Sequence, residues 1–161
     1  MPKVTLVLHN IRSTHNVGAI FRSAEGFGVV KIILTGYTPY PSYNGDNRLP
    51  HLAEKITRQI HKTALGAESI VPFEHHDTID EWLITNRLPL IGLEQATGSI
   101  MINDYTAPSE LALLLGEEVD GIEPELLALC DQTIEIPMRG KKESFNVSVA
   151  TGIALYALTS A

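Results

Sequence analysis

The fold is decided by residues 3–35, which read KVTLVLHNIRSTHNVGAIFRSAEGFGVVKIILT. Two short apolar runs, at 4–8 and 29–34, have the length and composition of buried strands. Between them, apolar residues recur at helical spacing over 16–27, with Arg22 on the opposite side. The stretch therefore predicts two strands joined by a helix, which is the repeating unit of an α/β sheet.

The same alternation continues along the rest of the chain. Further strands are expected at 69–74, 89–93, 111–115 and 133–136, and further helices at 50–65, 78–87, 123–130 and 144–159. This order predicts the α/β fold class, with a six-stranded, mostly parallel sheet and helices on both of its faces. All 161 residues fit one domain. The connection over 38–50 is too long for a routine turn and is either a binding loop or a mobile one.

Composition limits the classes of function. A formal charge of -7 argues against a protein that holds nucleic acid by overall attraction, so any RNA contact must be local. The expected contacts are the basic residues within 48–62 and 139–142. No apolar run approaches the ~18 residues of a membrane span, and residues 1–10 lack the pattern of a signal peptide. We therefore expect a cytoplasmic protein without a membrane partner.

The potential nucleophile and metal ligands are few. Cys130 is the only cysteine and lies among leucines, so we expect a core residue. The one dense group of ligand types is His75, His76 and Asp77. Adjacent residues of an extended segment point to opposite sides, so no metal site is expected there.

The last predicted helix is apolar on nearly every side. From Val147 to Leu158 only Ser148 and Thr151 interrupt the apolar residues. Such a helix needs cover from two directions. Burial against the chain's own sheet and a partner subunit would supply it, which predicts a twofold homodimer; the alternative is a central helix within a monomer.

Three polar segments remain as candidates for a functional site, each at the end of a predicted strand. They read NIRSTHNVGAIFRSA over 10–24, LLLGEEVDGI over 113–122 and IPMRGKKESFNVSVA over 136–150. Open α/β sheets bind their ligands at the carboxyl ends of their strands. Neither a G-x-G-x-x-G turn nor a phosphate-binding P-loop is present in the sequence, so a standard nucleotide site is not expected.

On these three motifs, in this order and spacing, the sequence resembles the SpoU (TrmH-type) family of 2'-O-ribose RNA methyltransferases, within the SPOUT superfamily. The resemblance runs nearly end to end. It implies a C-terminal deep trefoil knot, which is rare among proteins. It also implies that the second and third motifs bind S-adenosylmethionine, largely through backbone groups. The matching positions are Leu93, Gly116, Ile136, Met138 and Ser144. Gly116 would let the ligand approach the backbone, and Ile136 and Met138 would flank the adenine.

The same resemblance implies a set of catalytic positions. They are Asn16, Arg22, Glu118, Ser144 and Asn146, and the visible departure from the family is Phe145, where leucine is commoner. The family pattern makes Arg22 the proton acceptor or activator. Because a guanidinium is almost always charged, we favour electrostatic stabilisation of the developing alkoxide instead. Glu118 would orient Arg22 or an amide across the site.

The implied substrate is a structured RNA. The first strand begins by residue 4, leaving no room for an added N-terminal RNA-binding domain, so we favour tRNA over rRNA. The implied second partner is another copy of the chain, bound through the knot region and the C-terminal helix. The alternatives are an rRNA 2'-O-methyltransferase, a SPOUT enzyme that methylates a base, and a non-catalytic RNA-binding dimer.

Overall fold

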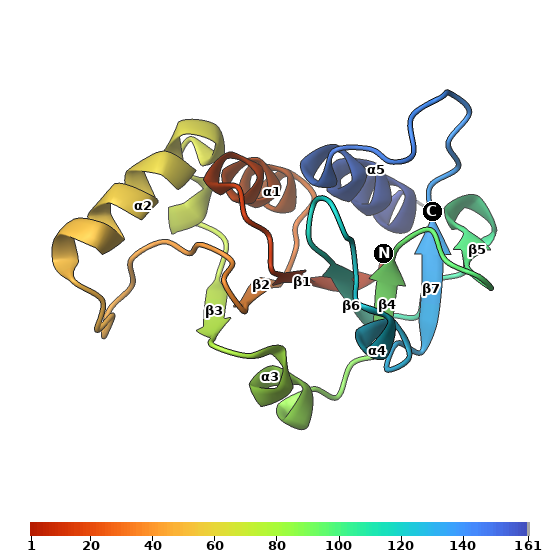
Figure 1. The fold of residues 1–161 in the computed structure, drawn as a ribbon, viewed down its shortest axis with the longest axis horizontal. Coiled ribbons are helices and arrows are strands. Elements are labelled where there is room, and N and C mark those ends of the chain that lie inside the picture. Colours follow the sequence, from red (N-terminus) through yellow and green to blue (C-terminus); the bar gives the residue numbers. More distant parts are fainter. Residues whose placement is uncertain (161) are drawn as a thin grey trace.

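A computed structural model describes residues 1–160, which form a sheet covered by helices (Figure 1). The strands are β1 (Lys3–His9), β2 (Lys31–Thr35), β3 (Phe73–His76), β4 (Leu90–Leu93), β5 (Ile100–Met101), β6 (Glu110–Leu115) and β7 (Gln132–Glu135). The helices are α1 (Thr14–Gly26), α2 (Pro50–Ala64), α3 (Ile79–Thr85), α4 (Pro124–Leu127) and α5 (Val147–Thr159), with short 3-10 turns η1 (Ala67–Ser69) and η2 (Ile102–Asp104). The strand order is β3-β2-β1-β6-β4-β7-β5, and every neighbouring pair is parallel.

The α/β class and the parallel sheet are confirmed, but the expected number of strands was wrong. The described sheet has seven strands rather than six, because β5 is only two residues long and leaves no alternating pattern. The strand expected at 69–74 begins only at Phe73, since η1 and Pro72 precede it. The helix expected from 144 begins at Val147, and the one expected over 123–130 is the single turn α4.

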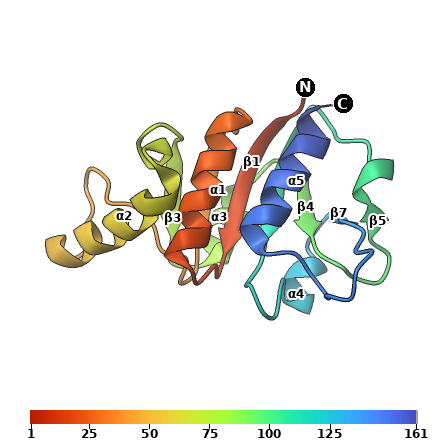
Figure 2. The same ribbon diagram turned by 90° about the horizontal axis from the view of Figure 1, so that it is seen from above.

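Helices cover the sheet on both faces. Figure 2 shows α1 between α2 and α5 on one face, and Figure 1 shows α3 and α4 on the other. Strand side chains alternate between the two layers. Leu6 and Leu8 of β1 pack in the cluster with α1 and α5, whereas Val7 packs with Trp82 of α3 and Leu126 of α4. The core is therefore two apolar layers with the sheet between them.

Strand β1 lies in the middle of the sheet and is buried on both sides. It pairs with β2 in one direction and with β6 in the other, where Lys3 lies opposite Glu110. Leu6, Val7 and Leu8 are fully buried. The central pair thus joins the start of the chain to a segment more than a hundred residues later.

Helices α1 and α2 meet at a glycine. A Cβ added to Gly18 would lie 2.1 Å from Thr63 Oγ1 and 2.2 Å from the Ile60 carbonyl oxygen, so only glycine permits this approach. Thr63 Oγ1 donates to the carbonyl oxygen of His15 at 2.8 Å. Ser13 caps α1 by accepting from the Asn16 backbone N–H at 3.1 Å. The last turn of α2 is therefore fixed beside the first turn of α1.

The long connection between β2 and α2 is held by its own side chains. Tyr40 stacks on His75 with ring centroids 3.7 Å apart, and the Arg48 guanidinium lies 3.6 Å from the centre of the Tyr40 ring. Arg48 also donates to Asp46 and to the carbonyl oxygens of Tyr40 and Pro41. Arg48 was expected among the RNA contacts, but its guanidinium is already occupied within the loop.

Helix α5 is covered on one side only. Thr151, Ala154, Leu155 and Leu158 are buried, while Tyr156 is 64% exposed. One face of the apolar helix α5 is thus exposed, and none of residues 1–160 of its own chain packs over it. Across that described length, no helix is both long and apolar enough to cross a membrane.

Candidate active site

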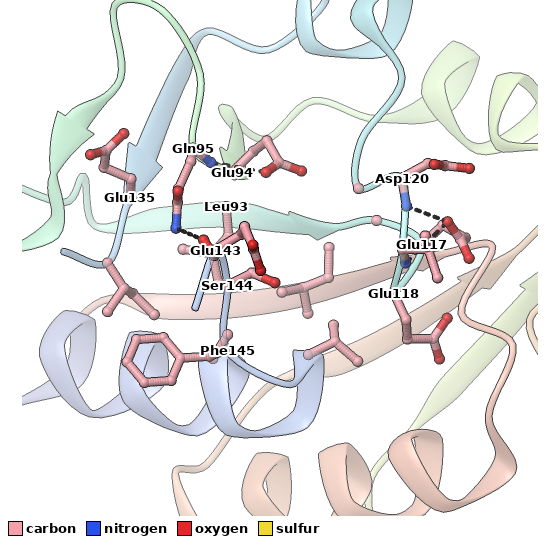
Figure 3. Close-up of a pocket in the computed structure, with 17 residues that line it drawn as sticks. Leu93, Glu94, Gln95, Glu117, Glu118, Asp120, Glu135, Glu143, Ser144 and Phe145 are labelled. Atoms are coloured by element: carbon pink, nitrogen blue, oxygen red, sulfur yellow. Dashed lines mark hydrogen bonds between the residues drawn. The ribbon is translucent and has the colours of Figure 1, made fainter. Parts of the chain in front are cut away.

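A pocket of about 310 Å³ lies at the carboxyl ends of β4, β6 and β7 (Figure 3). Its wall is made by the segments 93–95, 115–121, 135–136 and 143–145, together with Val147 and Ala150 of α5. The carboxyl ends of parallel strands are where such sheets bind ligands, because the connections there carry polar side chains and free backbone groups. The second and third sequence motifs therefore meet at one pocket.

Four of the five residues expected at the cofactor line this pocket. They are Leu93, Gly116, Ile136 and Ser144. Met138 does not line it, and its expected place beside the adenine stays a prediction. The chain leaves the pocket after Ile136 and returns to it only at Glu143, so Met138 lies on the part of the loop in between.

Gly116 is required by the chain's own packing. A Cβ at this position would lie 2.5 Å from the carbonyl carbon and oxygen of Gly121. The turn between them is closed by two backbone hydrogen bonds between Glu117 and Gly121, at 3.1 and 2.9 Å. We expected this glycine to admit a ligand, and the structure shows that it first admits the 117–121 turn, which then forms one wall of the pocket.

Two polar residues directly after β4 hold the pocket together, and the sequence analysis missed both. One Glu94 carboxylate oxygen accepts from the Ile122 backbone N–H at 3.0 Å, which ties the 117–121 turn to β4. Gln95 Nε2 donates to the Glu143 carbonyl oxygen at 2.8 Å, across the pocket (Figure 3). Their position at a strand end, the criterion applied to the three motifs, could have identified them.

A chain of hydrogen bonds joins all three motifs beside the pocket. The Glu118 carboxylate accepts from the backbone N–H groups of Arg12 and Ser13 and from Asn16 Nδ2, at distances of 3.0 to 3.1 Å. Asn16 Oδ1 in turn accepts from Asn146 Nδ2 at 3.2 Å. The two bonds of the Asn16 amide fix its orientation, because one end donates and the other accepts.

Glu118 is an ionised, orienting group in this arrangement. Burial alone would raise its pKa, but the hydrogen bonds from Arg12, Ser13 and Asn16 outweigh burial, so the pKa of Glu118 lies below its ordinary value. A carboxylate with a lowered pKa is a weak base at neutral pH. Glu118 therefore positions the 12–16 segment and is a poor proton acceptor.

Asn146 both caps α5 and ends this chain of bonds. Its Oδ1 accepts from the Ser148 backbone N–H at 2.9 Å and from Ser148 Oγ at 2.6 Å. Ser144 lies two residues earlier, exposed on the pocket wall. The start of α5 thus fixes the distance between the pocket and the Asn16 amide.

Arg22 lies apart from the other four expected catalytic residues. Six residues separate it from Asn16, which places the two side chains about 120° apart around α1. Arg22 is exposed, does not line the pocket and forms no ion pair with any residue of the described chain. Within the described chain, Glu118 and Ser144 line the pocket and hydrogen bonds join Asn16 and Asn146 to Glu118, whereas Arg22 neither lines the pocket nor takes part in these bonds.

The other reactive side chains have structural surroundings. Burial raises the pKa of the Cys130 thiol to about 11, so it is protonated at neutral pH. His75 stacks on Tyr40, while His76 lies near Glu74 on the other side of β3. Within residues 1–160 no group of three or more potential ligands is placed to hold a metal ion.

Comparison with known proteins agrees with this geometry. The family model described as "SpoU rRNA Methylase family" matches residues 3–156, which is almost the whole chain. The chain belongs to the SpoU family. The resemblance is thereby confirmed, and the three motifs that suggested it are those joined by hydrogen bonds beside the pocket.

Several SpoU proteins resemble the chain over nearly all of its length. The tRNA (guanosine(18)-2'-O)-methyltransferase of Escherichia coli is 31% identical over 160 residues, covering 96% of this chain and 62% of the relative. The AdoMet-bound rRNA methyltransferase of Sinorhizobium meliloti superimposes with a TM-score of 0.77 at 25% identity, covering 96% of this chain and 55% of that one.

A third similar structure is close in size to the chain. It is described as giving insights into the 2-OH methylation of C/U34 on tRNA, and it superimposes with a TM-score of 0.74 at 25% identity. The match covers 96% of this chain and 93% of that one. In contrast, the chain spans between 46% and 64% of the length of the first four curated SpoU relatives.

Proposed function

We propose that the chain transfers a methyl group from S-adenosylmethionine to a ribose 2'-hydroxyl of a structured RNA. The observation that carries this proposal is the bonded chain Asn146–Asn16–Glu118, which places two amides from separate motifs at the edge of the pocket. Three of the first four curated relatives are named as 2'-O-methyltransferases, and one similar structure is described as AdoMet-bound.

The residues of the pocket fit this cofactor. Leu93, Leu115 and Ile136 offer apolar surface for an adenine, and the 116–121 turn offers backbone groups for its polar edge. Glutamates stand at several points of the wall, including Glu135 and Glu143, and suit a ligand that carries a positive sulfonium. When bound, S-adenosylmethionine supplies the methyl group of the reaction.

The remaining roles follow from what each side chain can do. The 2'-hydroxyl gives up its proton to solvent as the new O–C bond forms, and negative charge develops on its oxygen during the transfer. The Arg22 guanidinium stays charged and stabilises that oxygen, helped by an RNA phosphate. Asn16, Asn146 and Ser144 orient the ribose, while Glu118 holds Asn16 in place.

We further propose that the active form is a homodimer that uses the knot region and α5. The uncovered apolar face of α5 supports a second copy, since Val149 is 50% and Tyr156 64% exposed. Arg22 supports it too, because in its own chain it neither lines the pocket nor joins the bonded chain Asn146–Asn16–Glu118, and a second copy would supply an Arg22 to the ribose. The trefoil knot, the single domain of residues 1–161 and the cytoplasmic location remain proposals from the resemblance and the sequence.

Mixing two inactive variants tests the dimer. We expect Arg22→Ala and Ser144→Ala chains to be inactive separately and to regain activity when unfolded and refolded together, because each supplies what the other lacks. The mass of the wild-type chain in solution should be that of two copies. A monomeric mass, or no regain of activity on mixing, would contradict the proposed arrangement.

Among RNAs we favour tRNA over rRNA. Two relatives, from Aquifex aeolicus and Escherichia coli, are named as tRNA methyltransferases, and one similar structure is described in connection with tRNA. The alternative functions are the same three that the sequence left open: an rRNA 2'-O-methyltransferase, a base methyltransferase or a non-catalytic RNA-binding dimer.

Two measurements test the activity itself. Calorimetric titration should show saturable S-adenosylmethionine binding, and total tRNA and rRNA treated with the protein and labelled cofactor should yield 2'-O-methylated nucleosides on mass spectrometry. A methylated base would identify the base methyltransferase. Binding of RNA without any methyl transfer would leave the non-catalytic dimer.

A further inference from the structure

The net charge of -7 conceals two oppositely charged parts of the chain. Between residues 63 and 138 the sequence holds 15 of its 19 acidic residues and one basic residue, Arg87. The remainder, 1–62 and 139–161, holds the other 11 lysines and arginines and only four acidic residues. The formal charges of the two parts are therefore -14 and +7, which together give -7.

The fold separates these two parts in space. The basic part contains α1, α2 and α5, which cover one face of the sheet, and the acidic part contains α3 and α4, which cover the other (Figures 1 and 2). The chain as a whole is acidic and attracts phosphate weakly. Its basic residues are nevertheless concentrated on the side of α1, α2 and α5, which can attract phosphate locally. The other face repels phosphate.

Within the basic part of the sequence, several cations are already paired. Lys3 pairs with Glu110, Lys31 with Glu74, and Arg48 with Asp46. Such pairing leaves little charge for a ligand. The basic residues that remain available gather on α2 and in the 139–142 loop, with Arg22 on α1.

Helix α2 presents three of these cations in one row. Lys55, Arg58 and Lys62 are exposed and follow at intervals of three and four residues, so they share one side of the helix. That side lies opposite the buried Ala53 and Ile60. Within the described chain, Lys55 and Lys62 form no ion pair, and Arg58 meets Glu54 only at 4.0 Å with both side chains about 70% exposed.

The row leads to the active site. Thr63, next to Lys62, donates to the His15 carbonyl oxygen, and His15 directly precedes Asn16. The row therefore runs outward from the first turn of α1. Lys55 and Lys62 are seven residues apart, which is about 10 Å along the helix axis. This length equals roughly three phosphate steps along one stacked nucleic-acid strand.

We propose that the outer side of α2 binds the phosphate backbone of the RNA next to the nucleotide that is methylated. This inference rests on the proposed function and adds to it the face on which the RNA lies. The row contains point charges and a guanidinium but no aromatic ring, so it contacts phosphates and positions the RNA without reading its sequence. The face of α3 and α4 stays free of RNA.

The test uses the salt dependence of RNA binding. The triple variant Lys55→Gln, Arg58→Gln, Lys62→Gln keeps good helix-forming residues and removes three charges. Its matched control, Lys3→Gln, Lys31→Gln, Arg87→Gln, has the same net charge but alters other surfaces. Affinity for unfractionated tRNA is measured between 50 and 200 mM salt, and S-adenosylmethionine binding is measured in parallel.

The expected result is specific to the row. The slope of log affinity against log salt should fall by about 2 to 3 in the triple variant, with affinity reduced roughly tenfold or more, because each phosphate contact contributes just under one unit. The control variant should keep the wild-type slope, and both should bind S-adenosylmethionine as the wild type does. Lys55→Arg with Lys62→Arg should retain the wild-type slope, since the charge is kept.

Three different outcomes would overturn the inference. Salt-dependent tRNA binding by the wild type with an unchanged slope in the triple variant would exclude the row while leaving the proposed function intact. A wild-type chain that binds S-adenosylmethionine but neither tRNA nor rRNA would remove the RNA substrate and this inference with it. Equal losses in the triple variant and the control would show that net charge, and not the row, determines binding.

Discussion

The two halves of the active site are built in different ways. On the half proposed for the ribose, three polar side chains from segments 102 and 130 residues apart are joined by hydrogen bonds into one chain. On the half proposed for the cofactor, the wall is mainly backbone and apolar surface, completed by an exposed loop that Gln95 holds at Glu143. The first half should therefore depend on side-chain identity and the second on where the backbone runs.

The largest effect is expected from Arg22→Lys, which tests the dependence on side-chain identity. The lysine keeps the charge but loses the planar fork, so kcat should fall about 10²- to 10³-fold, the usual loss for one stabilising group at a developing oxyanion. Arg22 does not line the pocket, so S-adenosylmethionine affinity should not change. Arg87→Lys, on the other face, is the control. Near wild-type turnover in Arg22→Lys would contradict the role of the guanidinium.

The substitution Gly116→Ala tests whether the cofactor half of the site depends on the path of its backbone. The added carbon would lie 2.5 Å from the Gly121 carbonyl group, so Gly116→Ala should lower the free energy of unfolding by about 3 kcal/mol and weaken cofactor binding. Gly26→Ala is the matched control, because a Cβ there meets no atom within 4 Å. Melting curves and calorimetry would measure both effects. A stable Gly116→Ala chain with normal affinity would show that the 117–121 turn can move.

Glu118→Gln removes the acceptor that organises the ribose half. The glutamine oxygen can replace Oε1, but the amide NH2 then takes the place of Oε2 against the Arg12 backbone N–H, and the negative charge is lost. We expect a loss of about 1–3 kcal/mol in the free energy of unfolding at pH 7. Urea unfolding would measure it. Exposed Glu25→Gln serves as the control and should change stability by less than about 0.5 kcal/mol.

The pH dependence of this loss gives an independent check. The pKa of Glu118 is lower in the folded chain than its ordinary value, so the carboxylate stabilises the fold fully above about pH 4.3. That stabilisation disappears as the pH falls through the folded-state pKa. The difference between wild type and Glu118→Gln should therefore be greatest at neutral pH and shrink below about pH 4. A difference that grows on acidification would contradict the lowered pKa.

The smallest effect is expected at the tether between Gln95 and Glu143. Gln95→Ala removes one hydrogen bond from an exposed loop, so the KM for S-adenosylmethionine should rise about 2- to 10-fold with the KM for RNA unchanged. Gln132→Ala is the control, because its amide donates only to the neighbouring Thr133 carbonyl oxygen. An unchanged KM for the cofactor would mean that the loop keeps its position without Gln95.

Local pattern predicted most of the fold, and the failures have physical reasons. The alternation of apolar runs and helical spacing gave the parallel sheet with helices on both faces, because strands buried on both sides must be apolar throughout. It could not give β5, whose two residues are positioned by pairing with β7 and not by their own pattern. The same pattern predicted that the last helix begins at residue 144, whereas α5 begins at Val147. The start is set by the Asn146 cap, which the apolar pattern does not reveal.

The site was harder to predict from sequence than the fold. Glu118, Asn16 and Asn146 were named from their family positions, but their mutual bonds depend on tertiary structure that no spacing reveals. Met138 was expected at the cofactor from its family position, but it does not line the pocket, because the path of a loop is not encoded in residue spacing. Gln95 was missed because its partner is a backbone carbonyl group, which has no sequence identity.

The pairing of β1 with β6 has a consequence for synthesis on the ribosome. Lys3 and Glu110 lie 107 residues apart. Strand β1, inside the sheet, is therefore synthesised first, but its pairing with β6 must wait until residue 115 has been made. At the usual pace of translation, the apolar strand waits roughly 5 to 20 seconds for its partner. During that time only β2 can cover one of its edges. The yield of folded protein should therefore depend on chaperones that shield the nascent N-terminal strand until β6 emerges.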